Sequence, residues 1–394
     1  MNDRSEHPAA SPSGVRLIAS ADTWIEGEAL RQLEQTAALP GMRAAVGLPD
    51  LHPGKGYPIG AAFLSERIYP ALVGNDIGCG MALWQTDLAT RKLKPERAVA
   101  RLQGLEGPWN GDLDAWRGEQ DLESTDFDSA LGTIGGGNHF AELQTVAEIL
   151  DRDAFSALDL DAEQLLLLVH SGSRGLGESI LRTLIEQQGH QGLDPASDAA
   201  QAYLARHDRA LDWAKANRRL IAARLLDALG AEAEPRLDVW HNLVHPLDWS
   251  GERLWLHRKG AAPADQGPLV IPGSRGTLSY LVQPSPDCDA SLRSLAHGAG
   301  RKWKRGEARG RLSARQRPDD LLTTALGGRV VCEDKELLYD EAPEAYKGID
   351  RVVADLVEAG LCHIIATLRP ALTYKVRRPA HKQPGHRKPQ RRRA

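Results

Sequence analysis

Long apolar runs are missing from this sequence of 394 residues. The longest purely apolar stretch is Leu165–Val169, whereas a membrane helix needs about 20 apolar residues in succession. We therefore expect no membrane partner. The first residues, MNDRSEHPAASPSG, lack the apolar core of a secretory signal, so we expect a cytoplasmic location.

Cysteine is also scarce. The chain has four cysteines, none in a C-x-x-C pair, so neither a disulfide scaffold nor a compact zinc finger is indicated. We expect Cys288, Cys332 and Cys362 to have no role beyond packing.

The P-loop pattern G-x-x-x-x-G-K-[ST] is absent from the sequence, so a nucleotide would have to be bound in another way.

Net charge is small, at −4, but unevenly distributed. Residues 376–394 contain eight Lys or Arg and no acid; subtracting these charges leaves −12 on residues 1–375. An acidic body argues against unspecific coating of nucleic acid, although a local basic groove remains compatible. The Pro-rich tail, 376–394, is expected to be disordered. It either is a solvated end or docks RNA, and the sequence leaves both open.

The periodicity of the remaining chain predicts a mixture of elements. Residues 1–14 are expected to be disordered. Helices are predicted over 22–38, 95–104, 177–188, 196–229 and 350–359, with Gly230 ending the longest. Short strands are predicted within 45–85, 132–143, 164–169, 236–345 and 362–368. Because helices and strands do not alternate regularly, we predict the α+β class, with one domain over 15–375 and one composite site.

Candidate metal ligands occur in four separate segments. Asp76 and Cys79 form a D-x-x-C pair in VGNDIGCGM, and three histidines lie at or beside the ends of predicted strands: His139, His170 and His241. Thiolate, imidazole and carboxylate together suit a divalent transition metal. A buried structural cysteine and hydrogen-bonded core histidines are the alternative, and the long intervals cannot decide between them.

Four glycine-rich segments could approach phosphate. They are LHPGKGYPIG with Lys55, GSRGLG, PGSRGT, and HGAGRKWKR with His297 and Arg301. Glycine lets the backbone come close to a phosphate, and Arg supplies charge. His297, in a Gly/Ala turn beside a basic run, suits a nucleophile that attacks phosphorus. Any one of these segments could equally be an ordinary turn.

Taken in order, these segments resemble the RtcB family of RNA ligases. The resemblance covers about residues 45–375. It rests on LPDLHPGKGYPIG, GNDIGCGMAL, GTIGGGNHF, VHSGSRGLG, HNLV, LHRKGAA, IPGSRGT, HGAGR, DEAPEAYKGID and LRPALTYK. It implies packed mixed β-sheets with peripheral helices and a central metal and nucleotide cleft.

The resemblance also implies roles for particular residues. Cys79 would bridge two manganese ions, with Asp76 and His139 completing one and His170 and His241 the other. His297 would be the catalytic nucleophile that takes GMP from GTP. Contacts to GTP would come from Asn138, Glu142, Ser274, Gly298, Ala299, Gly300, Tyr346 and Lys375. Contacts to RNA or phosphate would come from Asp50, Lys55, Arg174 and Arg301.

The implied reaction joins an RNA 2′,3′-cyclic phosphate or 3′-phosphate end to a 5′-hydroxyl end, with GTP and Mn²⁺. The chain is shorter than typical members, and Arg275 and Ala296 stand where methionine and cysteine are usual. It looks like a shorter branch that is associated with repair of cleaved ribosomal or transfer RNA and with a release-factor-like partner. Two other functions stay open: a metal-dependent phosphoesterase that opens cyclic phosphates without ligation, and a noncatalytic RNA-binding module.

Overall fold

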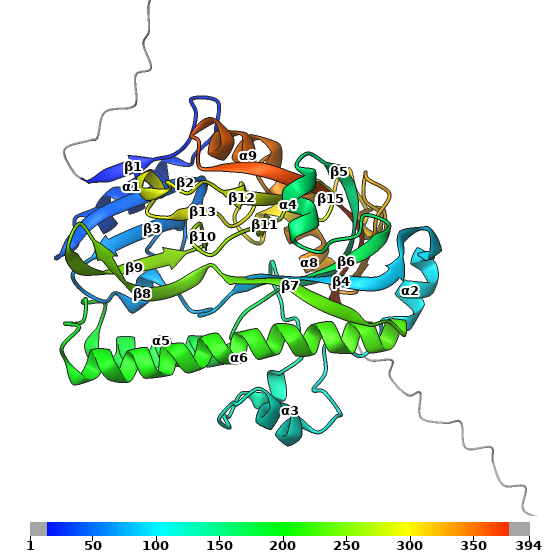
Figure 1. The fold of residues 1–394 in the computed structure, drawn as a ribbon, viewed down its shortest axis with the longest axis horizontal. Helices are drawn as coiled ribbons and strands as arrows, with labels where there is room; N and C mark the ends of the chain where they lie inside the picture. The colour runs from blue at the N-terminus through cyan, green and yellow to red at the C-terminus, as the bar shows by residue number, and fades with distance from the viewer. Residues whose placement is uncertain (1–13, 378–394) are drawn as a thin grey trace, which may run out of the picture.

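Three β-sheets form the centre of the computed structural model, which describes residues 14–377 (Figure 1). The first sheet has the strand order β1-β2-β3-β9-β8. Its strands are β1 (Val15–Leu17), β2 (Met42–His52), β3 (Ile59–Ser65), β9 (Glu252–Lys259) and β8 (Asn242–Trp249). The pair β1–β2 is parallel and the other pairs are antiparallel. Chain segments about 200 residues apart therefore meet in this sheet.

The largest sheet has eight strands. Its order is β11-β12-β15-β5-β6-β4-β7, and β14 also pairs with β15. Its strands are β11 (Leu269–Ile271), β12 (Ser279–Pro284), β15 (Cys362–Val376), β5 (Phe140–Ile149), β6 (Gln164–Ser171), β4 (Gly80–Ala89), β7 (Ala233–Trp240) and β14 (Arg329–Cys332). The strands β5, β6 and β4 are neighbours at its centre, and the apolar run that begins at Leu165 lies in β6. This run is buried because β6 is covered on both faces.

A third, two-stranded sheet joins β10 (Ala261–Pro263) to β13 (Ser294–Ala296). Ala261 pairs with Ala296, so Gly260 before β10 and His297 after β13 lie side by side. A Cβ added to Gly260 would come within 2.8 Å of the His297 ring. Gly260 also has a φ of +60°, and glycine is the residue that meets both requirements.

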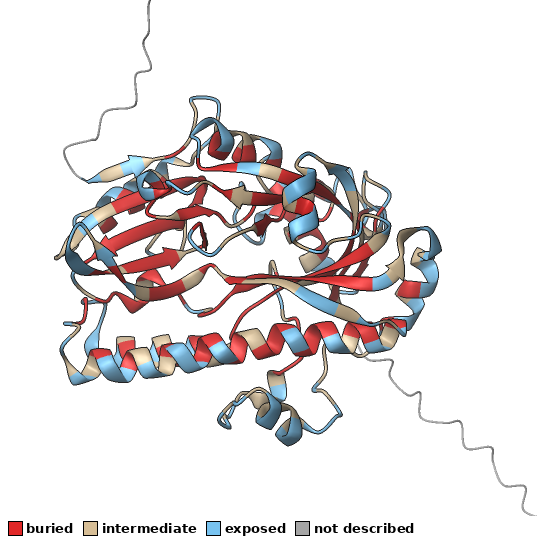
Figure 2. Cartoon of the chain, in the orientation of Figure 1, coloured by how far each residue is buried: buried red, intermediate tan, exposed pale blue. Residues whose placement is uncertain are grey.

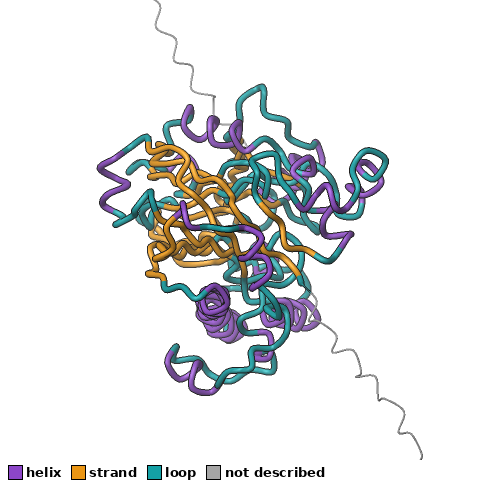
Figure 3. The backbone as a smooth tube through the Cα atoms, turned by 90° about the vertical axis from the view of Figure 1, so that its right-hand side faces the viewer, coloured by secondary structure: helices purple, strands orange, loops and turns teal. Residues whose placement is uncertain are grey.

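The helices lie outside the sheets, as the side view also shows (Figure 3). They are α1 (Gly27–Ala37), α2 (Pro95–Arg101), α3 (Leu113–Glu119), α4 (Arg152–Ala157), α5 (Gly175–Gln188), α6 (Asp198–Leu229), α7 (Glu307–Leu312), α8 (Lys335–Asp340) and α9 (Ile349–Glu358). The 32-residue α6 runs along one side of the molecule. Ser197 caps its N-terminus, and Gly230, left-handed at φ 67°, ends it.

Burial follows this layering. The strands are mostly buried, whereas α6 alternates buried and exposed residues along its length (Figure 2). Cys288, Cys332 and Cys362 are buried and unpaired, as expected of packing residues. Within residues 14–377, we find no helix that combines the length and the apolar character needed to cross a bilayer.

The structure confirms the α+β class and the long helix that ends at Gly230. Other expectations were wrong at the level of single elements. The helix predicted from residue 22 begins at Gly27, because residues 20–23 form a turn in which the Thr23 hydroxyl bonds to Asp355 of α9. The last strand continues beyond Leu368 to Val376, with irregular pairing around Pro370.

Short helices also escaped the sequence pattern. The segment 236–345 was expected to hold strands and turns, but it contains α7 and α8, whose apolar residues share one small core. Helices of six residues show little periodicity of their own and are stabilised by such packing. The predicted disordered segments lie outside the described residues except for Gly14, Val376 and Arg377; Val376 ends β15, and the Arg377 guanidinium bonds to the carbonyls of Val99 and Leu102.

Candidate active site

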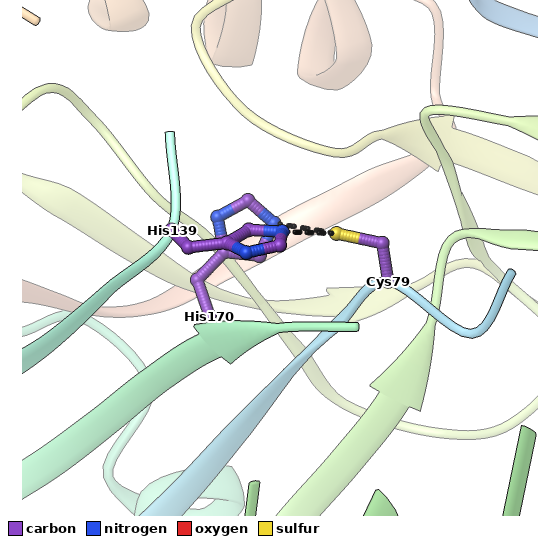
Figure 4. Close-up of side chains that lie close together, drawn as sticks. All are labelled: Cys79, His139 and His170. Atoms are coloured by element: carbon purple, nitrogen blue, oxygen red, sulfur yellow. Dashed lines mark hydrogen bonds between the residues drawn. The ribbon is translucent and has the colours of Figure 1, made fainter. Parts of the chain in front are cut away.

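A buried cluster of Cys79, His139 and His170 lies where three neighbouring strands begin or end (Figure 4). Cys79 immediately precedes β4, His139 immediately precedes β5, and His170 is the penultimate residue of β6. The Cys79 Sγ lies 3.3 Å from the Nε2 of His139 and 3.2 Å from the Nε2 of His170. Sulfur and imidazole nitrogen at this spacing form a candidate metal site.

Asp76 extends the cluster next to His139, and His241 extends it next to His170. The Asp76 Oδ2 lies 2.8 Å from the His139 Nε2, and the His241 Nε2 lies 3.3 Å from the His170 Nε2. His241 is held between β7 and β8, where its backbone N–H donates to the carbonyl of Cys79 at 2.8 Å. All five predicted metal ligands are therefore brought together, with the sulfur of Cys79 between two pairs.

Backbone carbonyls orient two of the imidazoles. The Nδ1 of His139 lies 3.1 Å from the carbonyl of Ile134, and the Nδ1 of His170 lies 3.1 Å from the carbonyl of Asn138. An Nδ1–H donated to a carbonyl leaves the lone pair on Nε2. In both rings Nε2 faces Cys79. The tautomer with its lone pair on Nε2 is the one that a metal ligand at this position requires.

Burial acts differently on the pKa values of the histidines, of Asp76 and of Cys79. It lowers the pKa of His170 and His241 well below the ordinary value, so both rings are neutral at pH 7. Burial alone would raise the pKa of Asp76, but His139 and the Arg174 N–H outweigh it, and the net shift is downward. Burial, and next the charge of Asp76, raise the pKa of Cys79 well above the ordinary value. A bound divalent cation opposes that effect and favours the thiolate.

His297 lies beside this cluster and is held by a buried carboxylate. Its ring centroid is 4.9 Å from that of His241. Its Nδ1 is 2.6 Å from the Oδ2 of Asp50, and its backbone N–H donates to the same oxygen at 3.2 Å. Asp50 is fully buried in β2. An Nδ1–H donated to Asp50 leaves the lone pair on the Nε2 of His297.

The cluster and His297 line a single cleft of about 880 Å³. Sixteen of the eighteen predicted site residues line it. These are Lys55, Asp76, Cys79, Asn138, His139, Glu142, His170, His241, Ser274, His297, Gly298, Ala299, Gly300, Arg301, Tyr346 and Lys375. Segments from both large sheets therefore meet in one composite site, although the role of each residue stays a prediction.

The two other predicted residues, Asp50 and Arg174, do not line the cleft. Asp50 contacts His297 instead of facing the cleft. The backbone N–H of Arg174 donates to Asp76 at 3.1 Å, and its guanidinium packs against Gly135, where a Cβ would come within 1.8 Å of it. Asp50 thus supports His297 and the Arg174 backbone supports Asp76, while the expected contacts of both residues to RNA or phosphate stay predictions.

A buried carboxylate that the sequence did not single out connects three predicted residues. Glu341 lies 3.4 Å from the Nζ of Lys375 and 3.2 Å from NH1 of Arg301, and it accepts a hydrogen bond from the Tyr346 hydroxyl at 2.5 Å. Arg301 also donates to the carbonyls of Trp303 and Asp340, so its guanidinium is already engaged within the protein. Only its position in DEAPEAYKGID could have indicated Glu341.

Glu142 is a buried carboxyl group that lines the same cleft. Its carboxylate accepts hydrogen bonds from Gln144 and from the hydroxyl of Thr373 on the paired strand β15. Burial raises the pKa of Glu142 to about 7, although both hydrogen bonds and the charge of Lys375 act in the opposite direction. Near neutral pH this carboxyl group can therefore accept or donate a proton with little cost.

Two residues of α6 brace the cluster from the other side. The fully buried Arg218 donates to the carbonyls of Gly78 and Ser171, next to Cys79 and His170, and pairs with Asp238. Asn217 bonds to Gly132 and Gly172. Sequence reasoning did not identify either residue, because inside a long helix they resemble any polar side chain.

Comparison with known proteins agrees with this geometry. A profile of the family described as "tRNA-splicing ligase RtcB" matches residues 32–106 and 106–376. The chain is 52% identical to "RNA-splicing ligase RtcB2" of Escherichia coli over 366 residues, or 92% of this chain and 95% of that relative. It is 30% identical to "RNA-splicing ligase RtcB" of Mycobacterium tuberculosis, in an alignment that covers 86% of this chain and 98% of that relative. It is 28% identical to "tRNA-splicing ligase RtcB" of Thermococcus kodakarensis, in an alignment that covers 86% of this chain and 89% of that relative. The protein therefore belongs to the RtcB family of RNA ligases.

Proposed function

We propose that this protein is a GTP- and Mn²⁺-dependent RNA ligase that acts through a guanylylated His297. The observation that carries the proposal is the pair His297–Asp50 at the edge of the metal cluster. A buried carboxylate on Nδ1 keeps the lone pair on Nε2 and stabilises positive charge that develops on the ring. A histidine in that state can attack phosphorus.

The ligand set supports two metal ions. Asp76 and His139 form one donor pair, His170 and His241 form the other, and Cys79 contacts one histidine of each. The donors are one thiol, three imidazoles and one carboxylate, a mixed set that fits divalent first-row transition-metal ions. When bound, two such ions would stabilise the attacking and leaving oxygens of phosphoryl transfer.

The proposed reaction divides one difficult step into easier ones. After a 2′,3′-cyclic phosphate is opened by water to a 3′-phosphate, the Nε2 of His297 bonds to the α-phosphorus of GTP and pyrophosphate leaves. An oxygen of the RNA 3′-phosphate then takes the GMP, and the N–P bond breaks. Finally the 5′-hydroxyl oxygen attacks the RNA phosphorus, loses its proton, and GMP leaves.

The remaining cleft residues support a nucleotide site for this chemistry. Lys375, Ser274 and Tyr346 lie together with the Gly298–Gly300 turn that follows His297. In that turn a Cβ on Gly300 would come within 2.3 Å of the Asp50 carbonyl, so the turn needs glycine there. Lys55 is exposed at the rim, where an RNA end would enter.

The natural substrate we propose is cleaved ribosomal or transfer RNA with 3′-phosphate and 5′-hydroxyl ends, repaired in the cytoplasm together with a release-factor-like partner. The support is the family membership and the length of the chain. The 30% identical alignment extends over 431 positions, whereas this chain has 394 residues, so those relatives carry insertions that this chain lacks. Residues 15–375 would form the ligase domain.

The test is incubation with α-³²P-labelled GTP and Mn²⁺, for wild type and His297→Ala, followed by denaturing gel electrophoresis. We expect covalent label on wild type alone. The label should be lost in acid and kept in base, because it is held by an N–P bond. His363→Ala is the matched control: this exposed histidine bonds to Asp151 away from the cleft and should keep full labelling.

Absence of label on wild type that has bound Mn²⁺ would reject the proposal. A protein that then still opened RNA 2′,3′-cyclic phosphates would be the phosphoesterase considered above, which needs the metal cluster but not His297. A product formed from 5′-phosphate RNA as readily as from 5′-hydroxyl RNA would contradict the proposed last step.

A further inference from the structure

Lys347 is a half-buried lysine whose ammonium group bonds to the backbone of β2. Its Nζ donates to the carbonyl of Pro49 at 3.1 Å and to the carbonyl of Leu51 at 2.6 Å. These two residues precede and follow Asp50, the carboxylate that holds His297. Lys347 itself is not among the residues that line the cleft. Its side chain can therefore act on a reaction in the cleft only through the residues that it holds.

The backbone of Lys347 is bonded to the turn that follows His297. Its N–H donates to the carbonyl of Gly300 at 3.0 Å. Gly300 in turn packs against the carbonyl of Asp50, to which a Cβ on Gly300 would come within 2.3 Å. Lys347 thus contacts both chain segments whose relative position determines the pair Asp50–His297.

The carboxylate of Asp50 needs such support because it is fully buried. Its Oδ2 accepts hydrogen bonds from the ring and the backbone of His297, but its Oδ1 has no hydrogen-bond partner within residues 14–377. A buried carboxylate with one unpaired oxygen is costly, and a nearby positive charge offsets part of that cost. Burial lowers the pKa of Lys347 to about 8, although the charge of Asp50 acts in the opposite direction, so most of the ammonium stays protonated at pH 7.

We propose that Lys347 is a positioning residue for the nucleophile: its ammonium group fixes the backbone on both sides of Asp50, and with it the direction in which that carboxylate holds the ring of His297. This inference rests on the proposed function. In an attack on phosphorus, Nε2 must be aligned with the reacting bond, and a displacement of about 1 Å can cost about 100-fold in rate. GTP would be bound by residues that line the cleft, so Lys347 should affect the rate of guanylylation and not the affinity for GTP.

The test is single-turnover labelling with α-³²P-labelled GTP and Mn²⁺ over a range of GTP concentrations, for wild type, Lys347→Met and Lys347→Arg. Methionine has no donor, whereas arginine keeps both the charge and the donors. In Lys347→Met the maximal rate should fall about 10- to 100-fold, while the half-saturating GTP concentration and the bound Mn²⁺ should stay within about twofold. Lys347→Arg should recover most of the rate. The exposed Lys335→Met is the matched control and should be labelled like wild type.

A further variant separates positioning from a general loss of folding. Lys347→Ala leaves room at the place of the ammonium group, so propylammonium added to the solution should restore part of the lost rate. Tetramethylammonium, which has no N–H, should restore none. A rate that neither arginine nor propylammonium restores would overturn the inference, as would an equal loss of rate and of GTP affinity in Lys347→Met.

Proton NMR with diamagnetic Zn²⁺ in place of Mn²⁺ separates this inference from the proposed function. The Nδ1–H of His297, which is hydrogen-bonded to Asp50, should give a downfield resonance in wild type that is missing in His297→Ala. Loss of this resonance in Lys347→Met, while wild type is never labelled by GTP, would support the positioning role and reject the ligase chemistry. The same resonance in Lys347→Met as in wild type would overturn the inference even if wild type is labelled.

Discussion

At the scale of single residues, the geometry of the site depends on hydrogen bonds that turn each donor toward the cleft. His139 and His170 are oriented by carbonyls, whereas His297 is oriented by a carboxylate. The difference has a chemical meaning. A carbonyl selects the neutral tautomer that His139 and His170 would need to bind a metal, and a carboxylate would also stabilise the positive charge that His297 develops in the proposed attack on phosphorus.

Asp50→Asn should therefore damage guanylylation more than metal binding. An amide on Nδ1 provides no negative charge and can favour the wrong tautomer, so the rate of labelling by GTP should fall about 10²- to 10⁴-fold. Bound metal, measured by atomic emission, should remain. The exposed Asp126→Asn is the control. Unchanged labelling in Asp50→Asn would show that the carboxylate only packs.

Glu142 should make stability depend on pH. Its pKa is raised from 4.5 to about 7, so the folded protein holds this proton more tightly than the unfolded chain. The free energy of unfolding should therefore fall as pH rises from 4.5 to about 7 and then stay level, by about 3 kcal/mol at most. Urea denaturation of wild type and Glu142→Gln, with chelator, should show wild type losing stability between pH 5 and pH 8 relative to the variant. Parallel curves would refute this.

At the scale of elements, the helix α6 covers the large sheet and also holds loops of the site in place. Its buried face packs along the large sheet, and polar side chains in the middle of that face bond to loops next to the candidate metal cluster. The helix therefore holds Gly78 and Ser171 in place, and with them the backbone next to Cys79 and His170. A structural helix and the site are linked through Arg218.

Removing the guanidinium of Arg218 should destabilise both the helix α6 and the site. Arg218→Met leaves Asp238 and two buried carbonyls without their partner, which should cost about 3–5 kcal/mol in the free energy of unfolding. Metal affinity should fall as well. The adjacent, exposed Arg219→Met is a matched control and should change stability by about 0.5 kcal/mol or less. Equal stabilities of the two variants would show that α6 does not brace the cluster.

At the scale of the whole molecule, the cleft exists because two large sheets and the β10–β13 pair converge on it. The first sheet supplies Asp50, the large sheet supplies His170 and Lys375, and the small pair ends at His297.

The uneven charge, with an acidic body and a basic tail, is also a property of the whole molecule. Residues 378–394 carry seven Lys or Arg and are separated only by Arg377 from β15, the strand that contains Lys375.

If the tail docks RNA, deleting residues 378–394 should weaken binding of single-stranded RNA and flatten its salt dependence. Loss of seven phosphate contacts would lower the slope of log affinity against log salt by about 5 at most. Fluorescence anisotropy between low and high salt measures this slope, and labelling of His297 serves as the control for an intact site. The same slope in both proteins would leave the tail as a solvated end.

The sequence by itself determined the α+β class, the long helix ending at Gly230, the buried strand at Leu165 and the residue types of the site. These follow from local periodicity, from capping, and from motifs whose letters can be read in order. It could not indicate the short helices α7 and α8, whose stability comes from packing against each other and not from their own sequence.

Only the tertiary structure decided which side chains meet. Cys79 is 60 positions from His139 and 91 from His170. The three residues converge because β4, β6 and β5 are neighbouring antiparallel strands, and the residues lie where these strands begin or end on the same side of the sheet. Through the same cause, Glu341 joins Lys375 to Arg301 and Asp50 turns toward His297. Contacts between distant segments depend on strand order and packing, which no local pattern encodes.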